Sequence, residues 1–69
     1  MPEHPAGNQP ELLTISEAAE LLRAPVATLR YWRHHTTGPR SFRLGRRVLY
    51  RREDVHAWID VQHDLDRRE

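Results

Sequence analysis

The 69-residue chain has no cysteine, only three glycines and no long apolar run. Without cysteine it has neither a disulfide framework nor a cysteine-rich zinc site. No apolar run approaches the roughly 18 residues that a membrane-spanning helix requires, and the first residues contain no apolar signal-peptide core. The sequence also has no glycine-rich phosphate loop. These absences predict a cytoplasmic protein with no membrane partner.

A chain this short forms one small domain with little room for an enzyme cleft, so we expect no catalytic activity and no cofactor. The five histidines are the remaining candidates for metal chemistry. His34 and His35 are adjacent and point in different directions on a helix, whereas His56 and His63 lie seven residues apart and can share a face. Because no cysteine or HExxH pattern accompanies them, surface histidines without a metal are the better interpretation.

What the chain does have is an uneven distribution of charge, which its net charge of +1 hides. From Leu21 to Arg52 there are nine arginines and no acidic residue, while the flanking segments hold two arginines and all ten acids. A compact basic block suits a polyanion-binding face, because phosphate neutralisation dominates affinity for nucleic acids. The alternative is a solvated basic face without a partner.

Two helices separated by a tight turn are expected in the first half of the chain. Residues 1–11 form a proline-rich segment without periodicity, which predicts a disordered tail. Thr14–Glu17 fits a capping box, and apolar residues at helical spacing continue to about Arg23. Pro25 cannot continue that helix but suits the first turn of the next, which runs to about His34. Helix, tight turn and helix form a specific supersecondary motif.

The second helix has two different sides. At about 100° per residue, one side carries Pro25, Leu29 and Trp32, flanked by Thr28, and must face the core. The opposite side is a stripe at the spacing i, i+3, i+4, i+7 that consists of Ala27, Arg30, Tyr31 and His34. A cation, an aromatic hydroxyl, an imidazole and a small residue suit a recognition surface. An ordinary exposed face is the alternative.

Gly38-Pro39 ends this helical region, and the alternating run 41–50 around Gly45 predicts a β-hairpin. Pairing Phe42 with Tyr50 and Leu44 with Val48 places all four side chains on one face, and we prefer this register on burial grounds. It requires the loop Gly45-Arg46-Arg47, which does not have its glycine in the usual last position. The alternative is a two-residue Gly45-Arg46 turn that opposes Val48 to Arg43. In both registers Arg46 and Arg47 lie at the tip, and Arg43 points out of the sheet.

Glu53-Asp54 opens a third helix, with acids in the first turn as the helix dipole favours. Its inward stripe is predicted to consist of Val55, Trp58, Ile59, Gln62 and Leu65. Asp60 and Asp64 lie on the outward side, so this helix should face away from a polyanion. We expect the folded domain to span residues 12–65 and the C-terminus to fray over 66–69.

The predicted order is helix, tight turn, helix, two-stranded wing and C-terminal helix, a mainly α winged helix-turn-helix fold with a small β-hairpin. Between Leu12 and Asp60 the sequence resembles the small excisionase and MerR-like DNA-binding domains. The segments that carry the resemblance are 12–22, 27–32, Gly38-Pro39, 44–50 and 54–59.

This resemblance implies that the second helix enters the major groove of double-stranded DNA while the wing reaches the adjacent minor groove or backbone. The contacts would be made by Thr28, Arg30 and Tyr31 on the helix and by Arg46 and Arg47 on the wing. Leu49 departs from the family pattern, which often has a polar or basic residue there, and makes the outer wing face more adhesive. The long dimerisation helix and ligand domain of effector-sensing MerR regulators are missing, so we expect no small-molecule effector.

The function that follows is sequence-specific DNA binding as an excisionase-type architectural factor, which controls the direction of a phage-type integrase at attachment sites. A small transcriptional regulator of a mobile element is the first alternative. A basic scaffold that binds an acidic protein is an alternative of a different class. The basic centre and acidic ends of the chain also predict self-association on DNA, with the wing or Leu49 of one copy against the third helix of the next.

Overall fold

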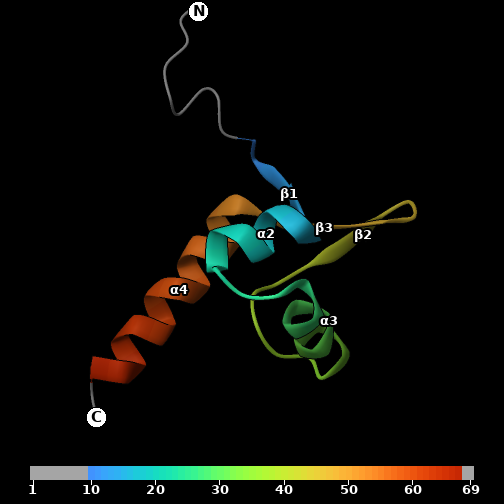
Figure 1. Ribbon diagram of the computed structural model, residues 1–69. Helices are drawn as coiled ribbons and strands as arrows, with labels where there is room; N and C mark the ends of the chain where they lie inside the picture. The colour runs from blue at the N-terminus through green and yellow to red at the C-terminus, as the bar shows by residue number, and fades with distance from the viewer. Residues whose placement is uncertain (1–9, 68–69) are drawn as a thin grey trace, which may run out of the picture.

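The computed structural model describes residues 10–67 as three helices and one small sheet (Figure 1). The elements in chain order are β1 (Leu12–Thr14), α2 (Ile15–Leu22), α3 (Val26–His34), β2 (Phe42–Leu44), β3 (Arg47–Arg51) and α4 (Arg52–Arg67). The antiparallel sheet has the strand order β1-β3-β2. The predicted fold class, mainly helical with a wing, is therefore confirmed. Residues 1–9 and 68–69, with most of the expected tail and part of the expected frayed end, lie outside the described residues.

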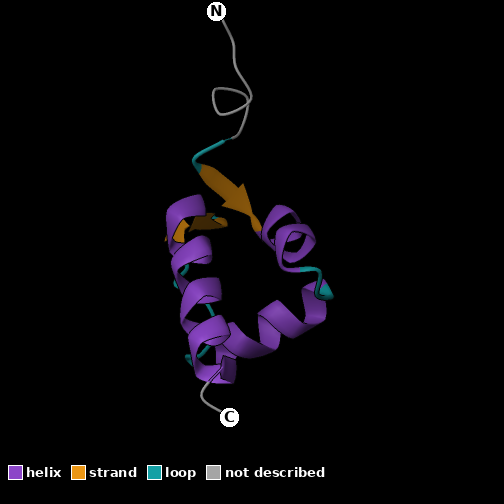
Figure 2. Ribbon diagram, turned by 90° about the vertical axis from the view of Figure 1, so that its left-hand side faces the viewer, coloured by secondary structure: helices purple, strands orange, loops and turns teal. Residues whose placement is uncertain are grey.

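The capping box and the tight turn predicted at the ends of α2 are both present. The Thr14 backbone N–H donates to Glu17 Oε1 at 2.9 Å, and the Glu17 N–H donates to Thr14 Oγ1 at 3.1 Å. The helix ends at Arg23, whose left-handed backbone has a φ of 58°. Pro25 then precedes the first turn of α3 and accepts the Thr28 N–H at 3.0 Å. As Figures 1 and 2 show together, this turn sends α3 off at a steep angle to α2, as in helix-turn-helix motifs.

The core lies where the sheet meets the helices, and five of the six elements contribute to it. Its fully buried members are Leu13, Ala18, Ala19, Leu29, Tyr50 and Val55. Trp32 and Trp58 were each predicted to lie on the inward side of their helix, and their ring centroids are 5.1 Å apart. Both indoles are only half-buried, so this pair closes the rim of the core rather than its centre.

The hairpin register preferred from the sequence is wrong. Phe42 pairs with Leu49 and Leu44 with Arg47, around the two-residue Gly45-Arg46 turn. Gly45 has a φ of 65° whereas Arg46 is not among the residues of positive φ. This is the combination that a type II′ hairpin turn requires, with glycine first. Turn chemistry therefore outweighs the burial pattern in setting the register.

The corrected register separates the apolar residues of the hairpin onto two faces. Paired residues share a face and successive residues alternate, so Val48 and Tyr50 lie on the inner face with Leu13. Phe42, Leu44 and Leu49 lie on the outer face instead. β1, which the sequence did not predict, adds Leu12 to this outer face through its pairing with Arg51. A three-residue strand is too short to show an alternating pattern.

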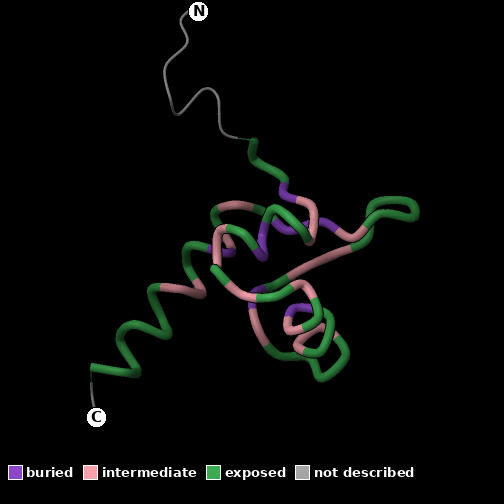
Figure 3. Tube along the Cα trace, viewed as in Figure 1, coloured by how far each residue is buried: buried purple, intermediate pink, exposed green. Residues whose placement is uncertain are grey.

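The C-terminal half of α4 projects beyond the core. Val55 is buried and Trp58 and Ile59 are half-buried, but every residue from Asp60 to Arg67 is exposed (Figure 3). Gln62 is exposed but lines a hollow with Leu22 and Trp58, so it lies on the predicted inward side of the helix. Leu65 is 52% exposed, and the prediction that it faces the core is wrong. At about 1.5 Å per residue, the 16-residue α4 is twice as long as the 8-residue α2, which it contacts. The second half of α4 thus has no helix of matching length to pack against.

Candidate nucleic-acid interface

The predicted recognition stripe lies on the exposed side of α3. Leu29 is completely buried and anchors the opposite side of the helix. The stripe residues Ala27, Arg30, Tyr31 and His34 are all exposed, and Thr28 is half-buried beside them. The Tyr31 side chain is 61% exposed, which is unusual for a large aromatic residue. Because its opposite side is buried in the core, α3 holds hydrogen-bond donors and an aromatic ring in a fixed position facing solvent.

His35 extends this stripe, although the sequence analysis did not include it among the site residues. Its ring centroid lies 4.1 Å from that of Tyr31 and 5.2 Å from that of His34. The i, i+4 spacing of Tyr31 and His35 was a signal that could have found it. Three adjacent rings therefore form the C-terminal part of the stripe.

A polar network behind α3 ties the helix to the base of the wing. Arg33 Nε donates a hydrogen bond of 2.8 Å to Ser41 Oγ. Ser41 also makes a side-chain hydrogen bond with Tyr50 of β3. Burial raises the pKa of the Tyr50 phenol above its usual value, while the Arg33 guanidinium and the Ser41 hydrogen bond act to lower it. The network joins the helix and the wing without using any residue of the exposed stripe.

The three predicted wing arginines are exposed and occupy three different places on the hairpin. Arg46 is in the turn, and Arg47 is the first residue of β3. The prediction that Arg43 points away from the core face of the sheet is wrong, because Arg43 pairs with Val48 and so lies on the inner, helix-facing side. Arg47 lies on the outer side. The wing thus carries positive charge at its tip and on both faces.

Three of the nine arginines of the basic block make contacts within the fold, and two of these three are half-buried. Arg33 is half-buried in the network described above. Arg51 forms an ion pair of 2.7 Å with Glu53, and Arg52 Nε donates to the Pro10 carbonyl at 2.9 Å. The arginines without such contacts lie on the wing and around α3. The exposed positive charge is therefore confined to a smaller surface than the basic block 21–52 of the sequence indicates.

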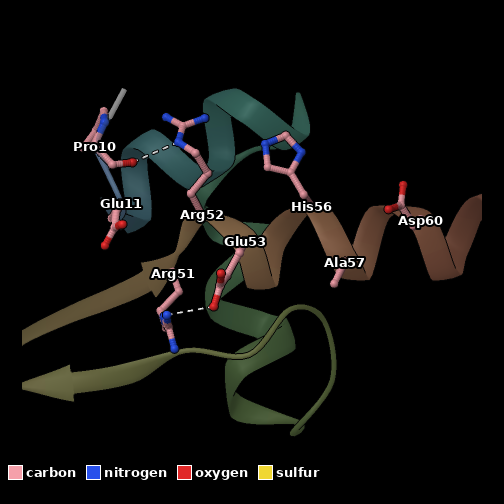
Figure 4. Close-up of a pocket in the computed structure, with 8 residues that line it drawn as sticks. All are labelled: Pro10, Glu11, Arg51, Arg52, Glu53, His56, Ala57 and Asp60. Atoms are coloured by element: carbon pink, nitrogen blue, oxygen red, sulfur yellow. Dashed lines mark hydrogen bonds and ion pairs between the residues drawn. The ribbon is translucent and has the colours of Figure 1, made fainter. Parts of the chain in front are cut away.

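An open hollow beside the start of α4 contains two of these internal contacts (Figure 4). The ion pair of Arg51 and the hydrogen bond of Arg52 lie on its lining, with His56 and Asp60 further along the helix. Arg52 also donates its backbone N–H to the Glu11 backbone carbonyl at 2.8 Å. These contacts fasten the segment before β1 to the N-terminus of α4.

Within residues 10–67, no three His, Asp or Glu side chains gather in a group that could hold a metal ion. In the same residues, no helix combines the length and the apolar character that crossing a membrane requires.

A helix, a tight turn, a second helix lying across the first, a wing and a closing helix together define a winged helix-turn-helix domain. Residues 12–62 match the model of the helix-turn-helix domain family, and the chain belongs to that family. No curated protein and no solved structure matches the chain. The family is one of DNA-binding domains, so double-stranded DNA is the partner of this fold.

Proposed function

We propose that the chain binds double-stranded DNA sequence-specifically, with α3 in the major groove and the wing at the adjacent minor groove or backbone. The observation that carries this proposal is the exposed stripe of α3 beside a wing with three exposed arginines. In Figure 1 the wing tip points away from the acidic C-terminal half of α4. A duplex placed against α3 and the wing would therefore meet positive charge and avoid Asp60 and Asp64.

The side chains of the stripe and of the wing differ in the kind of DNA contact that their chemistry allows. Arg30 can donate two hydrogen bonds to a guanine edge, and Ala27 can contact a thymine methyl group. Thr28, Tyr31 and His34 offer single hydrogen bonds to base edges or flanking phosphates. Arg43, Arg46 and Arg47 act through the backbone or a narrow minor groove, where they add affinity more than sequence preference.

Within this function, we infer an excisionase-type architectural role rather than a sensor role. The resemblance of the helix and wing segments to excisionase domains supports this, with a phage-type integrase as the protein partner. Cooperative self-association of copies on neighbouring sites belongs to the same proposal. The alternative is a small transcriptional regulator, which uses the same domain. An excisionase changes the direction of recombination, whereas a transcriptional regulator does not.

The experiment begins by selecting duplexes from a random library with the full chain. Binding to the selected duplex is then compared with binding to a shuffled duplex across a range of salt concentrations. We expect affinity to fall steeply with salt on both, because phosphate contacts release counterions. The selected duplex should bind at least about 10³-fold more tightly than the shuffled one. Equal affinity for both duplexes, with tighter binding to an acidic protein, would instead support the acidic-partner alternative.

The architectural role has a separate test on the selected site. Circularly permuted fragments should show a position-dependent mobility in the bound state, as a protein-induced bend requires. Addition of the chain to a phage-type integrase, on attachment-site DNA that contains the selected duplex, should raise excision and lower integration. A straight complex with no effect on recombination, together with repression of a promoter that contains the site, would favour the regulator.

A further inference from the structure

The tip of the wing carries one apolar side chain among its arginines. Leu44 and Arg47 form the last pair of the hairpin before the Gly45-Arg46 turn, and both side chains lie on the outer face of the sheet. Arg43 lies on the inner face, and Arg46 is in the turn itself. The three arginines are exposed, and Leu44 is 58% exposed. Leu44 is therefore an apolar group with a guanidinium group on each side of the tip and one at its end.

The fold does not use Leu44. Along the outer face, exposure rises toward the tip, from Leu49, which is 7% exposed, through the half-buried Phe42 to Leu44. Leu44 belongs neither to the core cluster nor to the residues packed against it. The turn beside it projects beyond the neighbouring elements (Figures 1 and 3), and a Cβ placed on Gly45 would meet no atom within 4 Å. Single exposed leucines are common on protein surfaces, so the location of Leu44 matters more than its exposure.

The surrounding charge separates Leu44 from the exposed apolar residues of α4. Val61 and Leu65 are 53% and 52% exposed, and both lie next to aspartates in the acidic half of that helix. The nearest acidic residue to Leu44 in the sequence is Glu53, which follows the far end of β3. The five residues of β3 span about 13 Å. A polyanion thus meets Leu44 together with the arginines of the tip, whereas aspartates repel it from Val61 and Leu65.

The chemistry of leucine distinguishes between the two DNA sites that the wing can occupy. A leucine side chain has no hydrogen-bond donor, so it gains nothing from a phosphate. In the minor groove, which is about 6 Å wide, the base edges present only hydrogen-bonding groups. The apolar surface within reach there is the stacked faces of the bases, and minor-groove proteins do insert leucine between base steps. Arginines are attracted into a narrow minor groove. The composition of the tip therefore favours the minor groove over the backbone.

We propose that Leu44 inserts between two base pairs from the minor groove, unstacks them and kinks the duplex. This role of Leu44 rests on the proposed DNA-binding function, and it assigns a residue to the bend that the architectural role requires. Arg43, Arg46 and Arg47 hold the tip in the groove. The kink is about 20–90° toward the major groove. The inserted step is TA or CA/TG, because pyrimidine–purine steps are the most easily unstacked. The site thus has a sequence preference at a step that no hydrogen bond reads.

The test uses the full chain and the duplex selected for it. Leu44→Ala removes the inserting side chain, whereas Leu44→Met keeps an apolar side chain of similar volume. The matched control is Leu65→Ala, the same change at a leucine of similar exposure on α4. Both positions lie outside the core cluster, and far-UV circular dichroism checks that each variant keeps the fold.

Insertion is measured by base unstacking and by bending. 2-Aminopurine, which becomes more fluorescent when it is unstacked, replaces each adenine of the duplex in turn, and energy transfer between dyes at the two ends measures the bend. Wild type, Leu44→Met and Leu65→Ala should brighten an adenine at the same step and bend the duplex equally. Leu44→Ala should brighten none, and its bend should be smaller by at least about 20°, the smallest kink that such insertions produce.

A mismatch at the brightened step gives an independent readout. A mismatched pair costs less to unstack than a matched one. Wild type and Leu65→Ala should therefore bind the mismatched duplex more tightly than the matched duplex, by about 5-fold or more. Leu44→Ala inserts nothing, so it should bind the two duplexes with equal affinity.

The outcomes separate this proposal from the proposed function. Equal affinity of wild type for the selected and the shuffled duplex would overturn DNA recognition, and the insertion of Leu44 with it. Specific binding in which no adenine brightens, or in which Leu44→Ala keeps the full bend, would overturn the insertion alone. It would also be overturned if Leu44→Ala kept the bend at a single site and lost only the binding of further copies, which would make Leu44 a contact between chains.

Discussion

Gly38 is the position where adding a single methyl group should test how α3 is held. A Cβ at Gly38 would lie 2.9 Å from both Cβ and Cε3 of Trp32, closer than such atoms approach in proteins. Gly38 also has a φ of 80°, which disfavours any residue with a side chain. The Trp32 Cβ is attached directly to the α3 backbone, so a rotation of the indole cannot relieve the contact. Gly38→Ala therefore has to move α3 or the loop.

Gly45 provides a matched control for this substitution. It has a φ of 65°, but a Cβ there would meet no atom within 4 Å. Both variants incur a left-handed backbone cost of about 1–2 kcal/mol. Only Gly38→Ala adds overpacking, at about 1–3 kcal/mol. We expect a loss of about 2–5 kcal/mol for Gly38→Ala, out of a total of about 3–10 kcal/mol for a domain of this size.

Urea unfolding, followed by circular dichroism and tryptophan fluorescence, measures this difference. With an m-value near 1 kcal/mol/M, the midpoint of Gly38→Ala should lie about 1–3 M below that of Gly45→Ala. The native fluorescence of Gly38→Ala should also change, because Trp32 packs against Trp58. Equal midpoints with unchanged fluorescence would refute the close approach of Gly38 to Trp32.

The remaining predictions concern the wing, the buried phenol and the first helix cap. Replacing Arg46 and Arg47 with Ala should flatten the slope of log K against log salt on duplex DNA by about 1–2 units, while an unchanged slope would place the wing away from the duplex. Because burial raises the Tyr50 pKa above 10.0, its contribution to stability is complete below about pH 10 and is lost as the pH rises through the folded-state pKa. Tyr50→Phe should reduce this alkaline loss and the exposed Tyr31→Phe should not, as unfolding midpoints between about pH 9 and 11, one unit on either side of the ordinary phenol pKa, would reveal. Thr14→Ala should cost about 1 kcal/mol through loss of the helix cap; a melting temperature equal to wild type would contradict the role of that hydrogen bond.

The parts of the fold that depend on local chemistry were predictable from the sequence. Thr14 and Glu17 specify a capping box within four residues, and Pro25 fixes where the next helix begins. The periodicity of the second helix separates Leu29 from Arg30 and Tyr31, and the burial of these residues follows it. These features are determined by residues close together in the sequence, so they can be predicted without knowing which distant segments come into contact.

The parts that failed depend on competition between local and distant effects. The hairpin register was predicted from the burial of apolar residues, but the glycine at the first position of the turn determines it. In the observed register Leu44 lies on the outer face of the sheet and is exposed. The stripe of α4 continues to Leu65 in the sequence, yet periodicity cannot tell how far the neighbouring elements extend. Composition likewise counted Arg33 as part of the basic face, although its side chain is held by Ser41.

Recognition of a base sequence by the exposed side of α3 is tested most directly with Arg30→Ala. Its affinity is measured on the selected duplex and on a shuffled duplex at one salt concentration. Arg67→Ala, at the far end of α4, serves as a charge-matched control. We expect Arg30→Ala to weaken binding to the selected duplex by about 1–3 kcal/mol, or about 5- to 150-fold, and to weaken binding to the shuffled duplex much less. Arg67→Ala should leave the ratio of the two affinities unchanged. Equal weakening of Arg30→Ala on both duplexes would contradict sequence reading by α3.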